Sequence, residues 1–180
     1  PADPTKKIKK KVSGFDAMCA DELDELDRRV AALGLLVEEL RTLGLLERTA
    51  IAVVGDHGEP RGEHGERTHG HFVYEGALRV PFVIRPPAGG AGSERRGSAD
   101  RGAASVVDVA PTLARAMGLG PLLASDGIDL LAGPIPAERG SYFECLSGFL
   151  ELGWSPLAGW ADARVKYVHS SEPELYVPQV

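Results

Sequence analysis

The chain has 180 residues, of which 43% are apolar and 26% charged, and its net charge at neutral pH is −6. This composition is typical of a globular protein with its own core, and the acidic balance argues against nucleic acid as a partner. No apolar run approaches the roughly 18 residues of a membrane span. The lysine-rich residues 1–13 predict a solvated linker or a frayed start.

Residues 15–43 predict a long helix, because apolar side chains recur at alternating spacings of three and four and so share one face. Gly44 is a suitable C-terminal stop. A short coiled coil is the alternative, but packing on a sheet is favoured. The stripe consists of Leu23, Leu26, Val30, Leu33, Val37 and Leu40.

Alternating strand and helix signals follow, which predict an α/β domain. Residues 49–55 form a β-branched apolar run typical of a buried parallel strand. Residues 78–87 predict a second strand with Pro81 near its start, and residues 88–100 a surface loop. Residues 106–119 predict a helix with Pro111 in its first turn and Gly118 near its end.

The tail has a different pattern, with short strand-like pieces separated by Gly, Pro and Asp. It predicts a small antiparallel sheet with a hairpin around Asp162. The expected organisation is a linker over 1–13, an α/β part over 14–135 and an antiparallel subdomain over 136–180.

Four of the five histidines lie between the two predicted strands, in a glycine-rich segment that also carries several carboxylates. Asp56 and His57 follow the first strand directly and offer an oxygen and a nitrogen ligand that suit Ca²⁺, Mn²⁺ or Zn²⁺. Gly55 and Gly58 let the backbone turn sharply around this pair. Two ligands do not complete a metal site, and a polar surface loop with incidental histidines is the alternative. Further candidate ligands are Glu59, Glu63, His64, His69 and His71.

Three stretches resemble the sulfatase family within the alkaline phosphatase superfamily. They are "VVGDHGEPRGEHGERTHGHFVYEGALRVPFVIRPP", "SVVDVAPTLARAMGL" with "DGIDLL", and the tail from "YFECLSGF" to "PELY". The resemblance covers roughly residues 15 to 177 and corresponds to the C-terminal part of the family. It implies part of an alkaline-phosphatase-like sheet flanked by helices, followed by the small antiparallel subdomain.

The resemblance also implies roles for individual residues. Asp56 and His57 match the family's metal-ligand pair, with calcium the foremost ion and manganese or zinc as alternatives. His69 stands thirteen residues after Asp56, where many members have a lysine that contacts the transferred group. His69 is therefore the predicted catalytic residue, and His71 is the second candidate for that role. Glu63 and His64 are expected to shape the loop, and Tyr74, Glu75, Arg79 and Pro81 the return strand.

The family's nucleophile, carried in sulfatases by a C/S-x-P-x-R motif, has no match in this sequence, and neither do the paired aspartates that complete the metal site. Cys19 and Cys145 lack the flanking proline and arginine, so neither is expected to be the nucleophile. The resemblance implies the C-terminal portion of a sulfate-ester hydrolase that is inactive alone. Alternatives are a phosphodiesterase or phosphoglycerol-transferase-type enzyme on the same scaffold, or a vestigial binding domain.

The expected partners are a small-molecule or glycan sulfate or phosphate ester, together with a missing N-terminal half or a second copy of the chain. Such a partner is expected because half of an α/β sheet leaves an open strand edge. Two cysteines without metal spacing imply no disulfide framework. Cytoplasm is the default compartment, although any export signal would lie upstream of Pro1.

Overall fold

The computed structural model describes residues 14–66, 69–100, 102–120 and 125–177, and contacts divide the chain into two units, Pro1–Leu46 and Glu47–Val180. The predicted linker over residues 1–13 lies outside the described part. Among the described residues, no helix combines the length and apolar character needed to cross a membrane.

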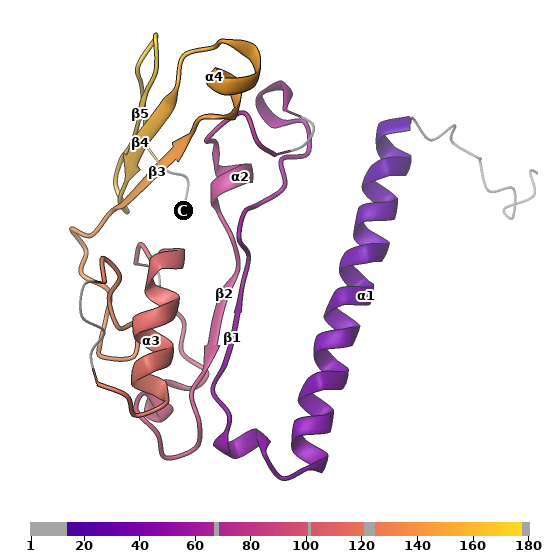
Figure 1. Ribbon diagram of the computed structural model, residues 1–180, viewed down its shortest axis with the longest axis vertical. Helices are drawn as coiled ribbons and strands as arrows, with labels where there is room; N and C mark the ends of the chain where they lie inside the picture. The colour runs from indigo at the N-terminus through magenta and orange to yellow at the C-terminus, as the bar shows by residue number, and fades with distance from the viewer. Residues whose placement is uncertain (1–13, 67–68, 101, 121–124, 178–180) are drawn as a thin grey trace, which may run out of the picture. The chain divides into compact units, whose positions relative to one another are not determined.

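The first unit contains helix α1 (Gly14–Thr42), which confirms the predicted long helix (Figure 1). Gly44 ends it in the left-handed conformation, with φ of 67°. The Leu45 N–H donates to the Leu40 carbonyl at 2.8 Å and the Gly44 N–H to the Arg41 carbonyl at 3.0 Å. These two bonds form a Schellman motif, which satisfies carbonyls that the helix leaves free. The packing of α1 on a sheet stays a prediction.

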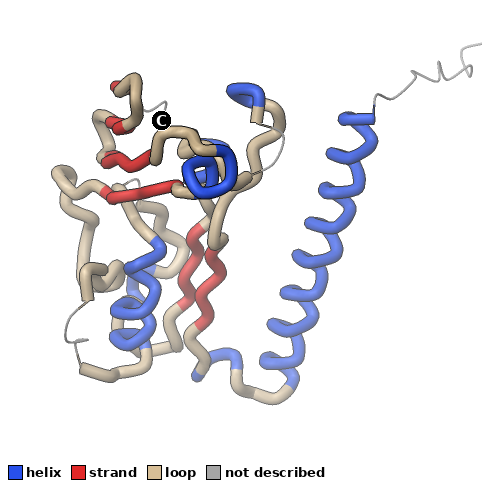
Figure 2. The backbone as a smooth tube through the Cα atoms, turned by 45° about the horizontal axis from the view of Figure 1, so that its top comes forward, coloured by secondary structure: helices blue, strands red, loops and turns tan. Residues whose placement is uncertain are grey.

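The second unit begins with strand β1 (Ile51–Val54), which pairs with β2 (Phe82–Arg85). The two strands run antiparallel, with Ile51 opposite Arg85 and Val54 opposite Phe82. Figure 2 shows the two strands side by side. The prediction of a buried parallel strand is therefore wrong for this pair, and all four β1 residues are only half-buried. A continuous apolar run records burial on two faces but does not fix which way the neighbouring strand runs. Here the chain returns alongside β1 in the opposite direction.

The predicted second strand also begins later than expected. Residues Glu75–Leu78 form a short helix, α2, and β2 starts only after Pro81. Proline has no N–H for the ladder, but its carbonyl still accepts the Gly55 N–H at 3.1 Å. The backbone pairing therefore continues one residue beyond β1, to Gly55, where the chain leaves the sheet.

The predicted loop over residues 88–100 contains one 3-10 turn, Ser93–Arg95, and the predicted helix after it is confirmed. A 3-10 turn, Val106–Asp108, leads into helix α3 (Val109–Ala116). Pro111 lies in the first turn of α3, and Gly118 follows its end with φ of 72°.

The tail forms the predicted small antiparallel sheet, which has four strands in the order β3-β4-β5-β6 (Figure 1). Asp162 turns the β4–β5 hairpin, where its carboxylate accepts the backbone N–H groups of Arg164 and Val165. A short helix, α4, between β3 and β4 was not predicted. The elements are β3 (Ser141–Cys145), α4 (Ser147–Leu152), β4 (Leu157–Ala161), β5 (Lys166–His169) and β6 (Glu174–Tyr176).

Lys166 links this sheet to α2, which lies in the connection between β1 and β2. It is buried on β5, its Nζ lies 3.0 Å from a Glu75 carboxylate oxygen on α2, and it sits over the Phe143 ring at 5.2 Å. A buried ammonium must be paired, so this contact fixes α2 against the sheet. The C-terminal sheet therefore helps to hold the connection between β1 and β2 in position.

Candidate metal and active site in the histidine loop

We call residues 55–81, which connect β1 to β2, the histidine loop. Its start is held tightly against α2, because the Gly58 N–H donates to the Ala77 carbonyl at 2.7 Å. A Cβ added at Gly58 would stand 2.1 Å from the Gly76 carbonyl oxygen. Only glycine fits this close approach. The sequence thus fixes the backbone immediately after Asp56 and His57.

Asp56 and His57 form the predicted metal-ligand pair, and their donor atoms converge. Asp56 Oδ2 lies 3.9 Å from His57 Nε2, and Asp56 Oδ1 accepts the His57 backbone N–H at 3.1 Å. The side chain of Asp56 is 94% exposed. The backbone N–H groups of Asp56 itself and of His57 lower the pKa of the Asp56 carboxyl, which keeps it ionised.

The orientation of the His57 ring suits a metal ligand. Its Nδ1 lies 2.9 Å from the Gly58 carbonyl oxygen, so Nδ1 carries the proton and Nε2 presents its lone pair. Two ligands bound to one ion at about 2.3–2.6 Å lie no more than about 5 Å apart, and the 3.9 Å separation satisfies this limit. The donor atoms of Asp56 and His57 therefore fit a divalent cation.

His69 lies beside this pair and is held by Glu59. The His69 and His57 rings stack with centroids 3.7 Å apart. One Glu59 oxygen accepts the His69 backbone N–H at 3.1 Å, and the other lies 2.9 Å from His69 Nδ1. These two contacts orient the ring. They involve the backbone N–H and Nδ1 of His69, and Nε2 takes no part in them. His57, Glu59 and His69 also offer three ligand atoms that all lie within 4.8 Å of one another.

His71 makes its contacts with the C-terminal part of the chain rather than with the His57 and His69 rings. Its ring faces Trp154, with centroids 5.9 Å apart, and its Nε2 lies 3.9 Å from a Glu151 carboxylate oxygen on α4. His64 stacks on Tyr74 at 3.8 Å and has a positive φ of 55°. The structure therefore gathers His57 and His69 but separates His64 and His71 from them.

Glu66 was not foreseen from the sequence. Its side chain is buried, and its Oε1 accepts the backbone N–H groups of His71 and Phe72 at 2.9 and 3.1 Å. Glu59 and Glu66 thus link the first part of the loop to its later part, which returns to β2: Glu59 contacts His69, and Glu66 contacts the backbone of His71 and Phe72. A glutamate in a polar loop gives no pattern by which such a contact could be recognised, since its partners are backbone groups.

The chain is similar to known proteins. The family model for Sulfatase matches residues 9–119. An ulvan-active sulfatase from Formosa agariphila is 29% identical over 160 residues, which is 88% of this chain and 25% of that protein. Arylsulfatase K from Bos taurus is 38% identical over 82 residues, which is 46% of this chain and 14% of that protein.

The chain is also similar to solved structures. A phosphonate monoester hydrolase from Agrobacterium radiobacter has a TM-score of 0.62 at 29% identity, covering 81% of this chain and 32% of that one. A structure solved in complex with its substrate D-glucosamine-2-N,6-O-disulfate has a TM-score of 0.61 at 26% identity, covering 80% and 30%.

The chain belongs to the sulfatase family, with an alkaline-phosphatase-like fold, and the predicted resemblance is confirmed. It spans about a quarter of the length of the Formosa agariphila relative. Members of this family are sulfatase-like hydrolases, a class that generally binds a divalent metal ion.

Proposed function

We propose that this chain is the C-terminal portion of a metal-dependent hydrolase that cleaves sulfate esters. The observation that carries the proposal is the Asp56–His57 pair at the end of β1, where an ionised carboxylate and an oriented imidazole converge 3.9 Å apart. Membership of the sulfatase family and the similarity to an ulvan-active sulfatase support sulfate ester, in a glycan or a small molecule, as the substrate.

Each residue of the cluster has a distinct role in the proposed reaction. Asp56 and His57 hold the metal ion, whose charge would offset the negative charge of the ester oxygens. As the imidazolium, with its Nδ1–H donated to Glu59, His69 would present its Nε2–H to an anionic oxygen or give that proton to the leaving-group oxygen, which would leave His69 neutral. His71 is the second candidate for this proton transfer.

Two donor sets share His57 and make different predictions about the metal. The family resemblance makes calcium the foremost ion for the Asp56–His57 pair, whereas an oxygen–nitrogen pair by its own chemistry also suits manganese or zinc. The set of His57, Glu59 and His69 would suit zinc, but an ion there would compete with His69 for the Glu59 carboxylate. We favour the first set because it leaves these contacts intact.

The proposal is tested by the thermal stability of the 180-residue chain with Ca²⁺, Mn²⁺ or Zn²⁺. At a metal concentration about 100 times Kd, binding should add about 2.7 kcal/mol to the free energy of unfolding. The double change Asp56→Asn with His57→Ala should abolish this gain, whereas Glu59→Gln should preserve it. No gain with any of the three ions would contradict the metal site and favour a non-catalytic binding domain.

We expect the 180-residue chain alone to have no esterase activity, because its sequence contains no C/S-x-P-x-R motif. The half-buried Cys145 does not replace it, since its Sγ donates to the Gly70 carbonyl at 3.1 Å. Release of p-nitrophenol from p-nitrophenyl sulfate by the pure chain would contradict this expectation.

Phosphate-ester chemistry is the second candidate, and the similarity to a phosphonate monoester hydrolase favours it. The two candidates differ in the ester that the metal-loaded chain should bind. Stabilisation by p-nitrophenyl sulfate in excess of that by p-nitrophenyl phenylphosphonate supports the sulfatase proposal. The reverse order favours the phosphate-type enzyme.

A further inference from the structure

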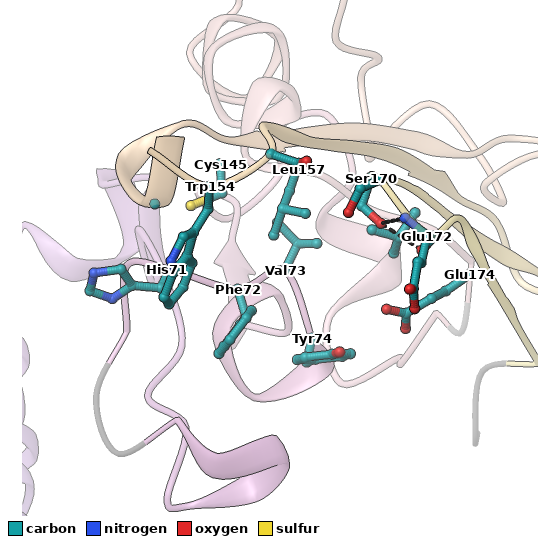
Figure 3. Close-up of a pocket in the computed structure, with 14 residues that line it drawn as sticks. His71, Phe72, Val73, Tyr74, Cys145, Trp154, Leu157, Ser170, Glu172 and Glu174 are labelled. Atoms are coloured by element: carbon teal, nitrogen blue, oxygen red, sulfur yellow. Dashed lines mark hydrogen bonds between the residues drawn. The ribbon is translucent and has the colours of Figure 1, made fainter. Parts of the chain in front are cut away.

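A cavity of about 250 Å³ lies between the histidine loop and the C-terminal sheet. Trp154 and His71 lie at one end, and Ser170, Glu172 and Glu174 lie at the other (Figure 3). Val73 and Leu157 lie between the two ends. The volume lies just below the range of about 300–1,000 Å³ for ligand pockets and suits a single ring rather than a long chain.

The cavity lies next to the backbone segment that carries His69, the proposed catalytic residue. Cys145, which lines the cavity, donates its Sγ–H to the carbonyl of Gly70 at 3.1 Å. Gly70 lies between His69 and His71 in the sequence, and His71 itself lines the cavity. A group bound here would therefore lie next to the segment that carries His69.

One end of the cavity offers aromatic faces. The Trp154 and Phe72 rings lie 5.9 Å apart and nearly parallel, at 20°, and Phe72 lies 5.7 Å from Tyr74. Trp154 remains 47% exposed, so part of its indole is free for a ligand. Aromatic rings combine a broad apolar surface with little conformational freedom, which suits stacking against the apolar face of a sugar ring.

The other end offers carboxylates. The Ser170 hydroxyl donates to the Glu172 carbonyl at 2.6 Å and accepts the Glu172 N–H at 3.1 Å, which fixes this turn. Burial raises the pKa of Tyr74, and the neighbouring Glu174 carboxylate raises it further. Among the described residues that line the cavity, none is lysine or arginine. Carboxylates accept hydrogen bonds from hydroxyl and ammonium groups and repel other anions.

We propose that this cavity binds the alcohol part of the ester as one hydroxylated sugar ring, neutral or bearing an ammonium group, and that Glu172 and Glu174 exclude acidic sugars. The aromatic end stacks on the ring and the acidic end binds its hydroxyl groups. The assignment of this ring as the leaving group rests on the proposed function, but its binding requires neither turnover nor metal.

The test is an NMR titration of the metal-free 180-residue chain with glucose, glucosamine and glucuronate, which differ chiefly in charge. The chain has two tryptophans, so the indole N–H signals of Trp154 and Trp160 report separately after assignment with Trp154→Phe. Glucose and glucosamine at millimolar concentration should move the Trp154 signal and leave Trp160, which does not line the cavity, in place. Glucuronate should move neither signal.

The double change Glu172→Gln with Glu174→Gln keeps the shape of both side chains and should allow glucuronate to bind. Trp154→Ala should weaken glucose binding by about tenfold or more. Binding to this variant is measured from the backbone amide signals of other residues that line the cavity. No shift of Trp154 with any sugar would overturn the site, and an equal response to glucuronate in the unchanged chain would overturn the charge selectivity. Sugar binding without metal stabilisation would overturn the hydrolase proposal but keep the site; the converse would remove only the site.

Discussion

Two polar clusters in this chain are built in opposite ways, one around Asp108 and the other in the histidine loop. Asp108 is completely buried. Its Oδ1 accepts the Ile128 N–H at 2.8 Å and lies 2.7 Å from Arg139 Nη2, and its Oδ2 accepts the Ser105 N–H at 2.8 Å. Every oxygen of this carboxylate is therefore used inside the protein.

Thr112, also fully buried, continues the same cluster. Its hydroxyl donates to the Ile128 carbonyl at 3.4 Å and accepts the Leu130 N–H at 3.0 Å. Together with Asp108 it fastens the start of α3 to residues 127–139. A cluster with so many internal partners stabilises the fold and has no atom left for a ligand.

The histidine loop has the reverse arrangement. Asp56, His57 and His69 are exposed, and each uses only part of its hydrogen-bonding capacity on its neighbours. Of the carboxylates in the described part of this loop, only Glu66, which accepts backbone N–H groups of the loop, is buried. The comparison teaches that the Asp108 carboxylate is fully committed to partners inside the protein, whereas the exposed Asp56 carboxylate keeps an oxygen that the proposed metal ion could bind.

The largest expected effect comes from Asp108→Ala. It leaves the half-buried Arg139 without its carboxylate and should lower the free energy of unfolding by about 3–5 kcal/mol in a denaturant titration. The matched change Asp56→Ala in the exposed loop should alter it by less than about 0.5 kcal/mol while removing metal binding. Equal losses of stability in the two variants would break the comparison.

A smaller effect is expected for Glu66→Ala, which leaves the buried N–H groups of His71 and Phe72 without their acceptor. Unfolding free energy should fall by about 1–3 kcal/mol. Glu66→Gln keeps an acceptor oxygen and should lose less. If both variants are as stable as the original chain, Glu66 does not hold the later part of the loop.

The smallest effect concerns acid stability. The pKa of Asp56 is lowered in the folded chain by backbone N–H groups, so this carboxylate contributes stability that is present above its ordinary pKa. That contribution is lost as the pH falls through the lowered folded value. Asp56→Asn should therefore show a slightly shallower loss of unfolding free energy on acidification. Identical slopes for the two proteins would show that Asp56 is not stabilised as an ion.

The site could be predicted from the sequence only in part. Asp56 and His57 were identified because they follow a strand directly, between glycines, and the structure brings their donor atoms together. The spacing that singled out His69 came from family resemblance, and the structure stacks its ring on His57. The contacts of Glu59 and Glu66 with the later part of the loop have no sequence pattern, because they join residues whose proximity depends on how the loop closes.

The sequence by itself determined the local elements and the family. The apolar stripe and Gly44 defined α1, Pro111 and Gly118 framed α3, and Asp162 marked the hairpin, because periodicity, capping and turns depend on residues close in the chain. Only the tertiary structure decided the antiparallel pairing of β1 with β2, the Lys166–Glu75 contact and the cavity beside His71. These features join residues far apart in sequence, and their geometry is set by the packing of the whole unit rather than by any local pattern.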